Sequence, residues 1–257
     1  MLDQRDASIL IPGYGPAHLT DACLVTVYAT SRPHEVLIWD NGIDHQDITN
    51  GDAVEVTRLL DQIYARSETA HHLTEPQSVW NVGFAGACNR MAAEATGEIL
   101  VFLNCDTEPQ EDWLEGLVRA FDEPDVGVAG ARLVNPDGEL QHAGIKVIIG
   151  GGIAWTVDIM DDLPTRDVAA VSGACLAIRR SVFEEIGGFD AEFWNCFEDG
   201  DLCLRVIQAG HRIRYVRESL VMHHGKATGA ERLTRVFPQV VRFQEKWANS
   251  VLVQPEA

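Results

Sequence analysis

Short apolar runs alternate with longer stretches of helical spacing through the first half of the chain. The runs at 8–12, 35–40, 98–103 and 126–129 have the length and composition of buried strands. Strands that alternate with helices in this way pair in parallel and bury both faces of the sheet under helices. The sequence therefore predicts an α/β fold. Helices are expected at 17–31, 53–66, 83–96 and 112–121.

The second half of the chain is less regular. The glycine-rich stretch between Gly144 and Thr165 is expected to be irregular, because a loop of that length is usually a lid or a connector. The apolar run at 168–178 predicts one strand, and 212–216 predicts another. No linker or repeat interrupts the chain, so we expect a single domain with a mixed central sheet. Further helices are expected at 181–186, 199–209 and 231–248.

The chain is strongly acidic. Its 257 residues include 39 aspartates and glutamates against 20 lysines and arginines, which gives a formal charge of −19. Such a field repels phosphate backbones and anionic lipid, so we expect no nucleic-acid partner. An anionic substrate would need a metal ion or helix N-termini to offset the repulsion.

Cysteine usage and hydropathy both argue against an exported or membrane-spanning protein. The six cysteines form no CxxC pair, and several lie in apolar runs, as expected for buried thiols in a reducing compartment. The first residues do not have the pattern of a signal peptide. No run approaches the roughly 20 apolar residues of a spanning helix. We therefore expect a cytoplasmic protein without a transmembrane segment.

Polar residues follow three of the predicted strands. Pro12–Tyr14, Asp40–Gly42 and Asn104–Asp106 stand at their carboxyl ends, where open α/β sheets bind ligands. Turn chemistry alone could explain Asp40–Gly42, but three such ends at one edge of a sheet favour a nucleotide pocket. Two common phosphate loops do not fit, because 13–18 lacks the third glycine of a dinucleotide loop and 225–228 lacks the upstream glycine of a P-loop.

A divalent metal ion is the natural way for such a chain to hold a diphosphate. Hard cations take oxygen ligands, and Mn²⁺ accepts imidazole as well. Asp106, at the end of a buried strand, and His223, in the second half of the chain, are the candidate ligands. A single histidine is more often structural than a ligand, so His223 also has a purely structural interpretation.

Three carboxylates crowd the predicted start of the helix near residue 199. The helix dipole favours each of them there, but three in four residues repel one another, so capping alone is a poor account. Asp201 can pair with Arg205, four residues later. Glu198 and Asp199 would then face a cleft, where one could act as a general base. Two neighbouring aromatic residues could form a platform for a sugar ring or pack in the core; they are Trp194 and Phe197.

Seven short motifs occur along the chain in a fixed order. They are Ser8–Pro12, Leu37–Gly42, Asn81–Asn89, Leu103–Thr107, Ser172–Cys175, Gly187–Asp190 and Phe197–Asp199. Together they resemble the family 2 glycosyltransferases, and Asp137–Gly144 is similar to the rhamnosyltransferase-like subgroup. The resemblance runs from Ser8 to about Thr228. It implies the Rossmann-like GT-A fold that binds nucleoside-diphosphate sugars.

The resemblance also implies roles for individual residues. Asp199 would deprotonate the acceptor hydroxyl, while Asp106 and His223 would hold Mn²⁺ or Mg²⁺ against the diphosphate. The family's Asp-x-Asp motif reads Asn104-Cys105-Asp106 here, so one carboxylate is replaced by an amide. The residues expected to contact the nucleotide are Pro12, Tyr14, Asp40, Asn81 and Asn104, and those expected on the acceptor side are Trp194 and Glu198.

The implied reaction is a single inverting displacement for the synthesis of cell-surface polysaccharide or glycoconjugate. It would move a sugar from a dTDP-, UDP- or GDP-linked donor to a glycan or glycolipid acceptor, with a lipid-linked acceptor approached from the membrane periphery. Residues 1–130 would form the nucleotide-binding half, 131–230 the acceptor-side half and 231–257 a C-terminal helix. The segment 150–162 is expected to order over the donor and exclude water.

Two other classes remain open from the sequence. Loss of one carboxylate at Asn104 would suit a catalytically weakened protein that only binds nucleotide sugars. A nucleotidyltransferase has a related sheet, but it would normally show a glycine-rich loop with a nearby lysine after the first strand. Here Gly13 and Gly15 are present and no lysine follows them.

Overall fold

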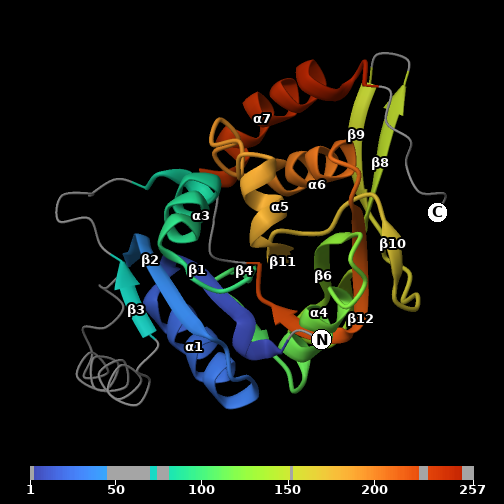
Figure 1. The fold of residues 1–257 in the computed structure, drawn as a ribbon. Coiled ribbons are helices and arrows are strands. Elements are labelled where there is room, and N and C mark those ends of the chain that lie inside the picture. The colour runs from blue at the N-terminus through green and yellow to red at the C-terminus, as the bar shows by residue number, and fades with distance from the viewer. Residues whose placement is uncertain (1–2, 45–69, 74–80, 151–152, 226–230, 251–257) are drawn as a thin grey trace.

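A mixed β-sheet with helices on both faces forms the centre of the computed structural model (Figure 1). The structure describes residues 3–44, 70–73, 81–150, 153–225 and 231–250, so the helix predicted at 53–66 lies outside the described residues. The strands are β1 (Ala7–Pro16), β2 (Glu35–Asp44), β3 (Ala70–Leu73), β4 (Ile99–Leu103), β5 (Thr107–Pro109), β6 (Val126–Val134), β7 (Leu140–His142), β8 (Ile145–Gly150), β9 (Ile153–Asp158), β10 (Arg166–Val168), β11 (Cys175–Arg179) and β12 (Arg212–His223). The helices are α1 (Ala17–Thr30), α3 (Gly83–Glu94), α4 (Trp113–Ala120), α5 (Arg180–Glu185), α6 (Glu198–Gln208) and α7 (Glu231–Trp247).

Ten of the described strands belong to one sheet, in the order β10-β12-β6-β11-β4-β1-β2-β3, with β5 beside β12 and β7 beside β6. Neighbours from β3 to β4 run parallel, whereas β11 is antiparallel to both β4 and β6. The predicted α/β class with a mixed sheet is therefore confirmed. Strands from both predicted halves of the chain share this sheet.

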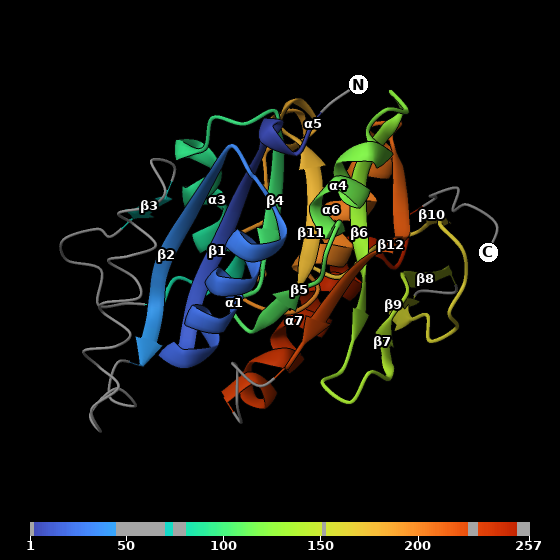
Figure 2. The same cartoon turned by 90° about the horizontal axis from the view of Figure 1, so that it is seen from below.

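Strand β4 shows how the apolar pattern fills both faces of the sheet. Ile99, Val101 and Leu103 pack on one face with α1 and α4, while Leu100 and Phe102 pack on the other with α3, α5, α6 and α7. Successive side chains of a strand point to opposite faces, so a continuous apolar run buries both. Figure 2 shows α1 and α4 together on the face nearer the viewer. All six cysteines are free thiols, five of them buried, as the sequence predicts.

The described helices begin and end within two residues of their predicted bounds. The first strand is longer than predicted, because its pairing with β2 continues past Pro12 to Pro16, whereas its pairing with β4 stops at Leu10. Proline is tolerated there because one side of the strand has no ladder to donate to. Among the described residues, no helix has the length and apolar character needed to cross a bilayer.

The prediction of one strand over 168–178 is wrong. β10 pairs with β12, whereas β11 lies between β4 and β6, so the run divides between two places in the sheet. Apolar residues between the two strands are buried in the core; Val171 lies outside any strand, and Ala170 forms a single antiparallel bridge with Ile145. Burial selects apolar residues whether or not the backbone is extended, and a run of this kind cannot separate the two cases.

The prediction of an irregular stretch over 144–165 is also wrong in its centre. β8 and β9 form an antiparallel hairpin, with Ile145 opposite Asp158. The hairpin stands beside α7 (Figure 1), where Gln244 Oε1 accepts a hydrogen bond of 2.8 Å from the backbone N–H of Ala154. The glycine-rich sequence hid the strand pattern, and the hairpin packs against α7, which is distant in the sequence.

Candidate active site

A cavity of about 300 Å³ opens at the edge of the sheet where β1 and β4 end. Nine of the ten predicted site residues line it, which brings together positions from 12 to 223. They are Pro12, Tyr14, Asn81, Asn104, Asp106, Trp194, Glu198, Asp199 and His223.

The topology explains why these segments meet. β1 and β4 are parallel neighbours, so their carboxyl ends share one edge. β11 runs the opposite way, and Cys175 at its start pairs with Leu103 at the end of β4. The backbone N–H of Asn104 donates to the carbonyl of Ala174 over 2.9 Å. The residues before β11 are thereby fixed against the residues after β4.

Asp106 and His223 form one wall of the cavity, which we call the metal side. Asp106 is only 3% exposed, and its Oδ1 lies 3.3 Å from His223 Nε2. The amide nitrogen of Asn104 lies 3.4 Å from the same ring nitrogen. β12 places His223 there, because His223 pairs with Thr107, next to Asp106.

The tautomer of His223 follows from Gln141. The Gln141 amide nitrogen donates to Asn135 Oδ1 over 2.8 Å, which leaves its oxygen to face His223 Nδ1 at 2.6 Å. We therefore assign the ring proton to Nδ1, with the lone pair of Nε2 turned toward the carboxylate of Asp106. The amide of Asn104 can donate to this lone pair, and a cation between Nε2 and the carboxylate of Asp106 would bind to both acceptors.

The metal side fits a divalent cation. Adjacent ligands of an octahedral ion with bonds of about 2.1 Å stand about 3.0 Å apart, close to the observed Asp106–His223 distance. Within the described part of the chain, no group of three or more His, Cys, Asp or Glu side chains is placed to hold a metal. The protein would then supply few ligands and leave positions for phosphate oxygens and water, as Mg²⁺ sites with phosphate substrates commonly do.

Asp199 lines the same cavity from the first turn of α6, and we call this part of the lining the base side. Its Oδ2 accepts a hydrogen bond from the backbone N–H of Gly173 over 2.9 Å, and its Oδ1 accepts one from Gly200 over 2.7 Å. Burial raises the pKa of Asp199 above its ordinary value of 3.8, although these two hydrogen bonds oppose the shift. Each carboxylate oxygen has a second lone pair, so Asp199 can still accept a proton from a substrate in the cavity.

The segment before α6 has a constrained backbone. Cys196 and Phe197 adopt left-handed φ angles of 78° and 67°, a region that side-chain-bearing residues rarely occupy. Trp194 is fixed against α3, since its carbonyl accepts the N–H of Phe84 over 2.8 Å. A Cβ on Gly83 would stand 2.3 Å from that carbonyl, so glycine is required there. Strained backbone of this kind is often kept where it orients functional groups.

The crowded carboxylates of α6 separate into two roles. Asp201 is fully buried and pairs with Arg205 Nε over 2.8 Å, as predicted. It also accepts a hydrogen bond from Trp247 Nε1 over 2.9 Å and pairs with Lys246 over 2.7 Å. Asp201 therefore anchors α7, whereas Glu198 and Asp199 line the cavity.

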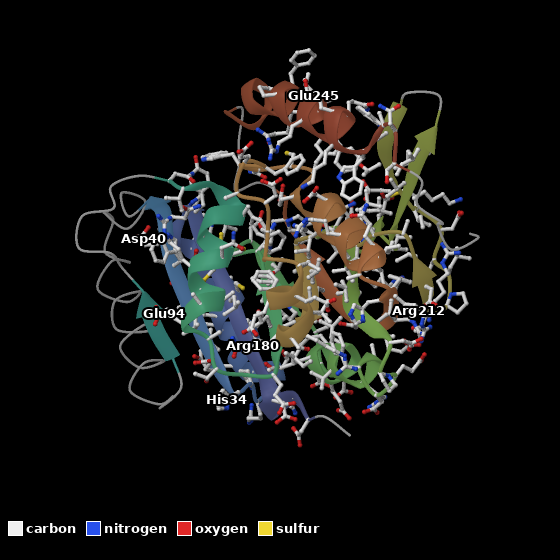
Figure 3. The ribbon with its side chains drawn as sticks, turned by 45° about the horizontal axis from the view of Figure 1, so that its top comes forward. His34, Asp40, Glu94, Arg180, Arg212 and Glu245 are labelled. Carbon is white, nitrogen blue, oxygen red and sulfur yellow. The ribbon has the colours of Figure 1, made fainter. Side chains whose placement is uncertain are left out.

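Asp40 is the predicted site residue that does not line the described cavity. Figure 3 shows it beside β2, on the opposite flank of the molecule from Arg212. Its Oδ1 accepts hydrogen bonds from the backbone N–H groups of Gly42 and Ile43 over 3.0 and 2.9 Å, which is turn chemistry. A contact of Asp40 with the nucleobase stays a prediction.

The sequence assigned no role to several residues that shape the site. Ser172 and Gly173 line the cavity, as do Thr156 and Asp158 of β9. Ser172 and Gly173 lie in the Ser172–Cys175 motif of the family resemblance, and that motif is the sequence feature that could have identified them. Thr156 and Asp158 were not singled out individually, but they lie in the segment 150–162 that was expected to order over the donor.

Solved structures with this fold bind nucleotides. GalNAc-T7, in a structure with UDP, GalNAc and Mn²⁺, superposes with a TM-score of 0.67 at 16% identity, over 85% of this chain and 43% of that one. A mannosyltransferase of Pyrobaculum calidifontis, PcManGT, in complex with GDP-Man and Mn²⁺, gives 0.59 at 20% identity, over 92% and 64%. These likenesses confirm the GT-A fold.

Sequence relatives point to the same family. The O-antigen biosynthesis protein RfbC of Myxococcus xanthus is 36% identical over 54% of this chain but only 12% of its own length. The N-acetylglucosaminyl-diphospho-decaprenol L-rhamnosyltransferase of Mycobacterium tuberculosis is 27% identical over 82% of this chain and 73% of its own. Residues 8–187, more than half of the chain, match the family described as Glycosyl transferase family 2. The chain belongs to glycosyltransferase family 2.

Proposed function

We propose that the chain is an inverting, metal-dependent glycosyltransferase that moves a sugar from a nucleoside diphosphate to an acceptor hydroxyl. The observation that carries this is that a candidate metal site and a candidate base line one cavity. Asp106 and His223 face each other on the metal side, and Asp199 stands on the base side with a raised pKa. A displacement with inversion needs the base and the leaving group on opposite sides of the anomeric carbon.

Asp199 takes the proton as the acceptor oxygen attacks. Its raised pKa makes it a stronger base than an ordinary aspartate, and the hydrogen bonds from Gly173 and Gly200 keep its plane fixed. Asp106 and His223 would hold the cation, with Asn104 beside them. When bound, a divalent cation neutralises the charge that develops on a diphosphate leaving group.

The names of relatives narrow the substrates. GalNAc-T7 is described with UDP and PcManGT with GDP-Man, and two relatives are named for O-antigen biosynthesis and for a rhamnosyltransferase. We propose a UDP-, GDP- or dTDP-linked donor and a glycan or glycolipid acceptor of the cell surface. A glycolipid acceptor would place the reaction at the periphery of a membrane.

Thermal melts with UDP, GDP and dTDP, each with and without Mn²⁺, test the donor site. A ligand at 100 times its Kd adds about 2.7 kcal/mol to the free energy of unfolding. We expect one nucleotide to stabilise the protein only when Mn²⁺ is present. The matching sugar nucleotides are then assayed for release of nucleoside diphosphate with an acceptor. No shift with any nucleotide would contradict the proposed donor site, whereas a shift without turnover of any sugar nucleotide would favour the weakened binding protein.

The pH dependence of turnover tests the base. Only the ionised carboxylate of Asp199 accepts a proton, so kcat falls as pH drops through its pKa. Because burial raises that pKa, the midpoint of the acid limb should lie above 3.8. A midpoint at or below that value would assign the base to another group.

A further inference from the structure

We propose that His142 is a positioning residue for the general base, acting through the backbone of Ser172 and Gly173. The inference rests on the proposed function, because it takes Asp199 as the base. His142 lies in the Asp137–Gly144 motif, to which the catalytic mechanism assigns no role. It is 2% exposed at the end of β7 and does not line the cavity.

Two consecutive backbone N–H groups connect His142 to Asp199. The N–H of Ser172 donates to His142 Nε2 over 3.2 Å, and the N–H of Gly173 donates to Asp199 Oδ2 over 2.9 Å. Ser172 and Gly173 lie between β10 and β11, outside any strand. The two N–H groups therefore donate to side chains rather than to the backbone of a neighbouring strand.

The hydrogen bond from Ser172 fixes the state of the imidazole. Because Nε2 accepts, we assign the ring proton to Nδ1, which lies 2.9 Å from Asp158 Oδ1 and donates to it. Asp158 thereby sets the tautomer in which Nε2 can hold Ser172. If the acceptor at Nε2 were lost, a backbone N–H near the cavity would have to find another partner, and Gly173 would shift with it.

Gln141, the neighbouring residue of β7, supports His223 on the metal side. Successive side chains of a strand point in opposite directions, and Gln141 faces His223 at 2.6 Å while His142 faces Ser172. β7 is held in place by pairing with β6, where His142 stands opposite Leu133. One short strand thus orients a residue on the metal side and a residue on the base side.

Two variants of His142 separate the role of Nε2 from that of Nδ1. The side-chain oxygen of His142→Gln can reach the position of Nε2 and accept from Ser172. The shorter amide of His142→Asn reaches only the position of Nδ1 and can donate to Asp158. We expect kcat to fall about 10- to 100-fold in His142→Asn and to stay within about threefold of wild type in His142→Gln.

Other measurements distinguish positioning from general damage. The KM for donor and the Kd for Mn²⁺ should stay within about twofold in both His142 variants, since the metal side is untouched. Amide exchange at 172–174 should speed up in His142→Asn alone. As the counterpart, Gln141→Leu should weaken Mn²⁺ binding about 10- to 100-fold, as loss of a partner of a metal-bound histidine typically does.

Equal kcat values for the two His142 variants, or a change confined to KM, would overturn the inference. If His142→Asn does not fold, His142→Gln carries the test alone, and a loss of more than about tenfold in its kcat would count against the proposal. Asp199→Asn is measured in parallel. If that variant keeps its turnover, the proposed function fails. If it loses turnover while both His142 variants do not, only the positioning role fails.

Discussion

The metal side and the base side of the cavity are held by different kinds of structure. Asp106 and His223 stand at the ends of sheet strands, and backbone pairing of His223 with Thr107 sets their separation. Asp199 instead follows the left-handed residues Cys196 and Phe197 and depends on helix packing. The difference teaches that the proposed leaving-group site is part of the sheet, whereas the proposed base is positioned by elements that pack onto the sheet.

Helix α7 packs against the segment that carries Asp199 and helps to hold it in place. Phe243 packs against Phe197 with ring centroids 5.2 Å apart, and Lys246 and Trp247 reach the buried carboxylate of Asp201, two residues after the base. Figure 1 shows α7 lying across α6 at the end of the molecule away from β1 and β4. Changes in α7 should therefore disturb Asp199 and spare the metal side.

The largest effect is expected for Asp199→Asn, which removes the base and preserves shape. Turnover should fall on the order of 10²- to 10⁴-fold, while donor binding measured by calorimetry stays within about twofold. An equal loss of donor affinity would mean that the two sides are not independent.

His223→Ala is the corresponding substitution on the metal side. Mn²⁺ affinity should fall by at least about 10- to 100-fold, the loss typical even of partners that only orient a ligand. His224→Ala is a matched control, because the side chain of His224 pairs with Glu108, and the hydrogen bond from its backbone N–H to the carbonyl of Asp106 is kept in the variant. Similar Mn²⁺ affinities for the two variants would remove His223 from the site.

Asp201→Asn tests whether the contacts of Asp201 with α7 stabilise the base side. The substitution removes the charge of a buried carboxylate that pairs with Arg205 and Lys246 and accepts a hydrogen bond from Trp247. The free energy of unfolding measured in urea should therefore fall by about 2–3 kcal/mol. Glu245→Gln, on the outer side of α7 (Figure 3), is the control and should change little. The Mn²⁺ affinity of Asp201→Asn should match wild type, and a parallel loss there would contradict the division between the two sides.

The smallest effect is expected from acid acting on Asp190. Burial by itself would raise the pKa of Asp190, but hydrogen bonds from Arg242 and Lys246 outweigh it and lower the pKa to about 2. A pKa below the ordinary 3.8 contributes stability above that pH, and the contribution is lost as pH falls toward 2. Melts of wild type and Asp190→Asn should differ by under about 1 kcal/mol near neutral pH and converge in acid. A constant difference across this range would assign the effect to packing.

Much of the fold is predictable from the sequence because the responsible signals are local. The continuous apolar run of β4 and the helical spacing of α3 and α6 each lie within a few residues, and each element was expected close to where it lies. The polar ends of β1 and β4 could be placed in one pocket since parallel strands end at the same edge.

Signals that depend on distant partners were missed. The division of 168–178 into β10 and β11 depends on which neighbours the strands find in the sheet, and the β8–β9 hairpin packs against α7, about 75 residues or more later in the chain. The same limit applies to His142 and Gln141, which lie in a recognised motif. The partner of His142 is Ser172, 30 residues away, and the partner of Gln141 is His223, 82 residues away.

By itself, the sequence determined the α/β class, the family and the chemical types at the site, because apolar period, turn residues and short motifs are properties of neighbouring residues. The sequence predicted that Asp201 pairs with Arg205 and that Asp199 faces a cleft, but only the tertiary structure decided that Asp201 also anchors α7. Three carboxylates in four residues have similar local environments along the chain. In the folded chain α7 supplies a cation and an indole to Asp201, and Gly173 supplies a backbone N–H to Asp199, and these partners are distant in the sequence.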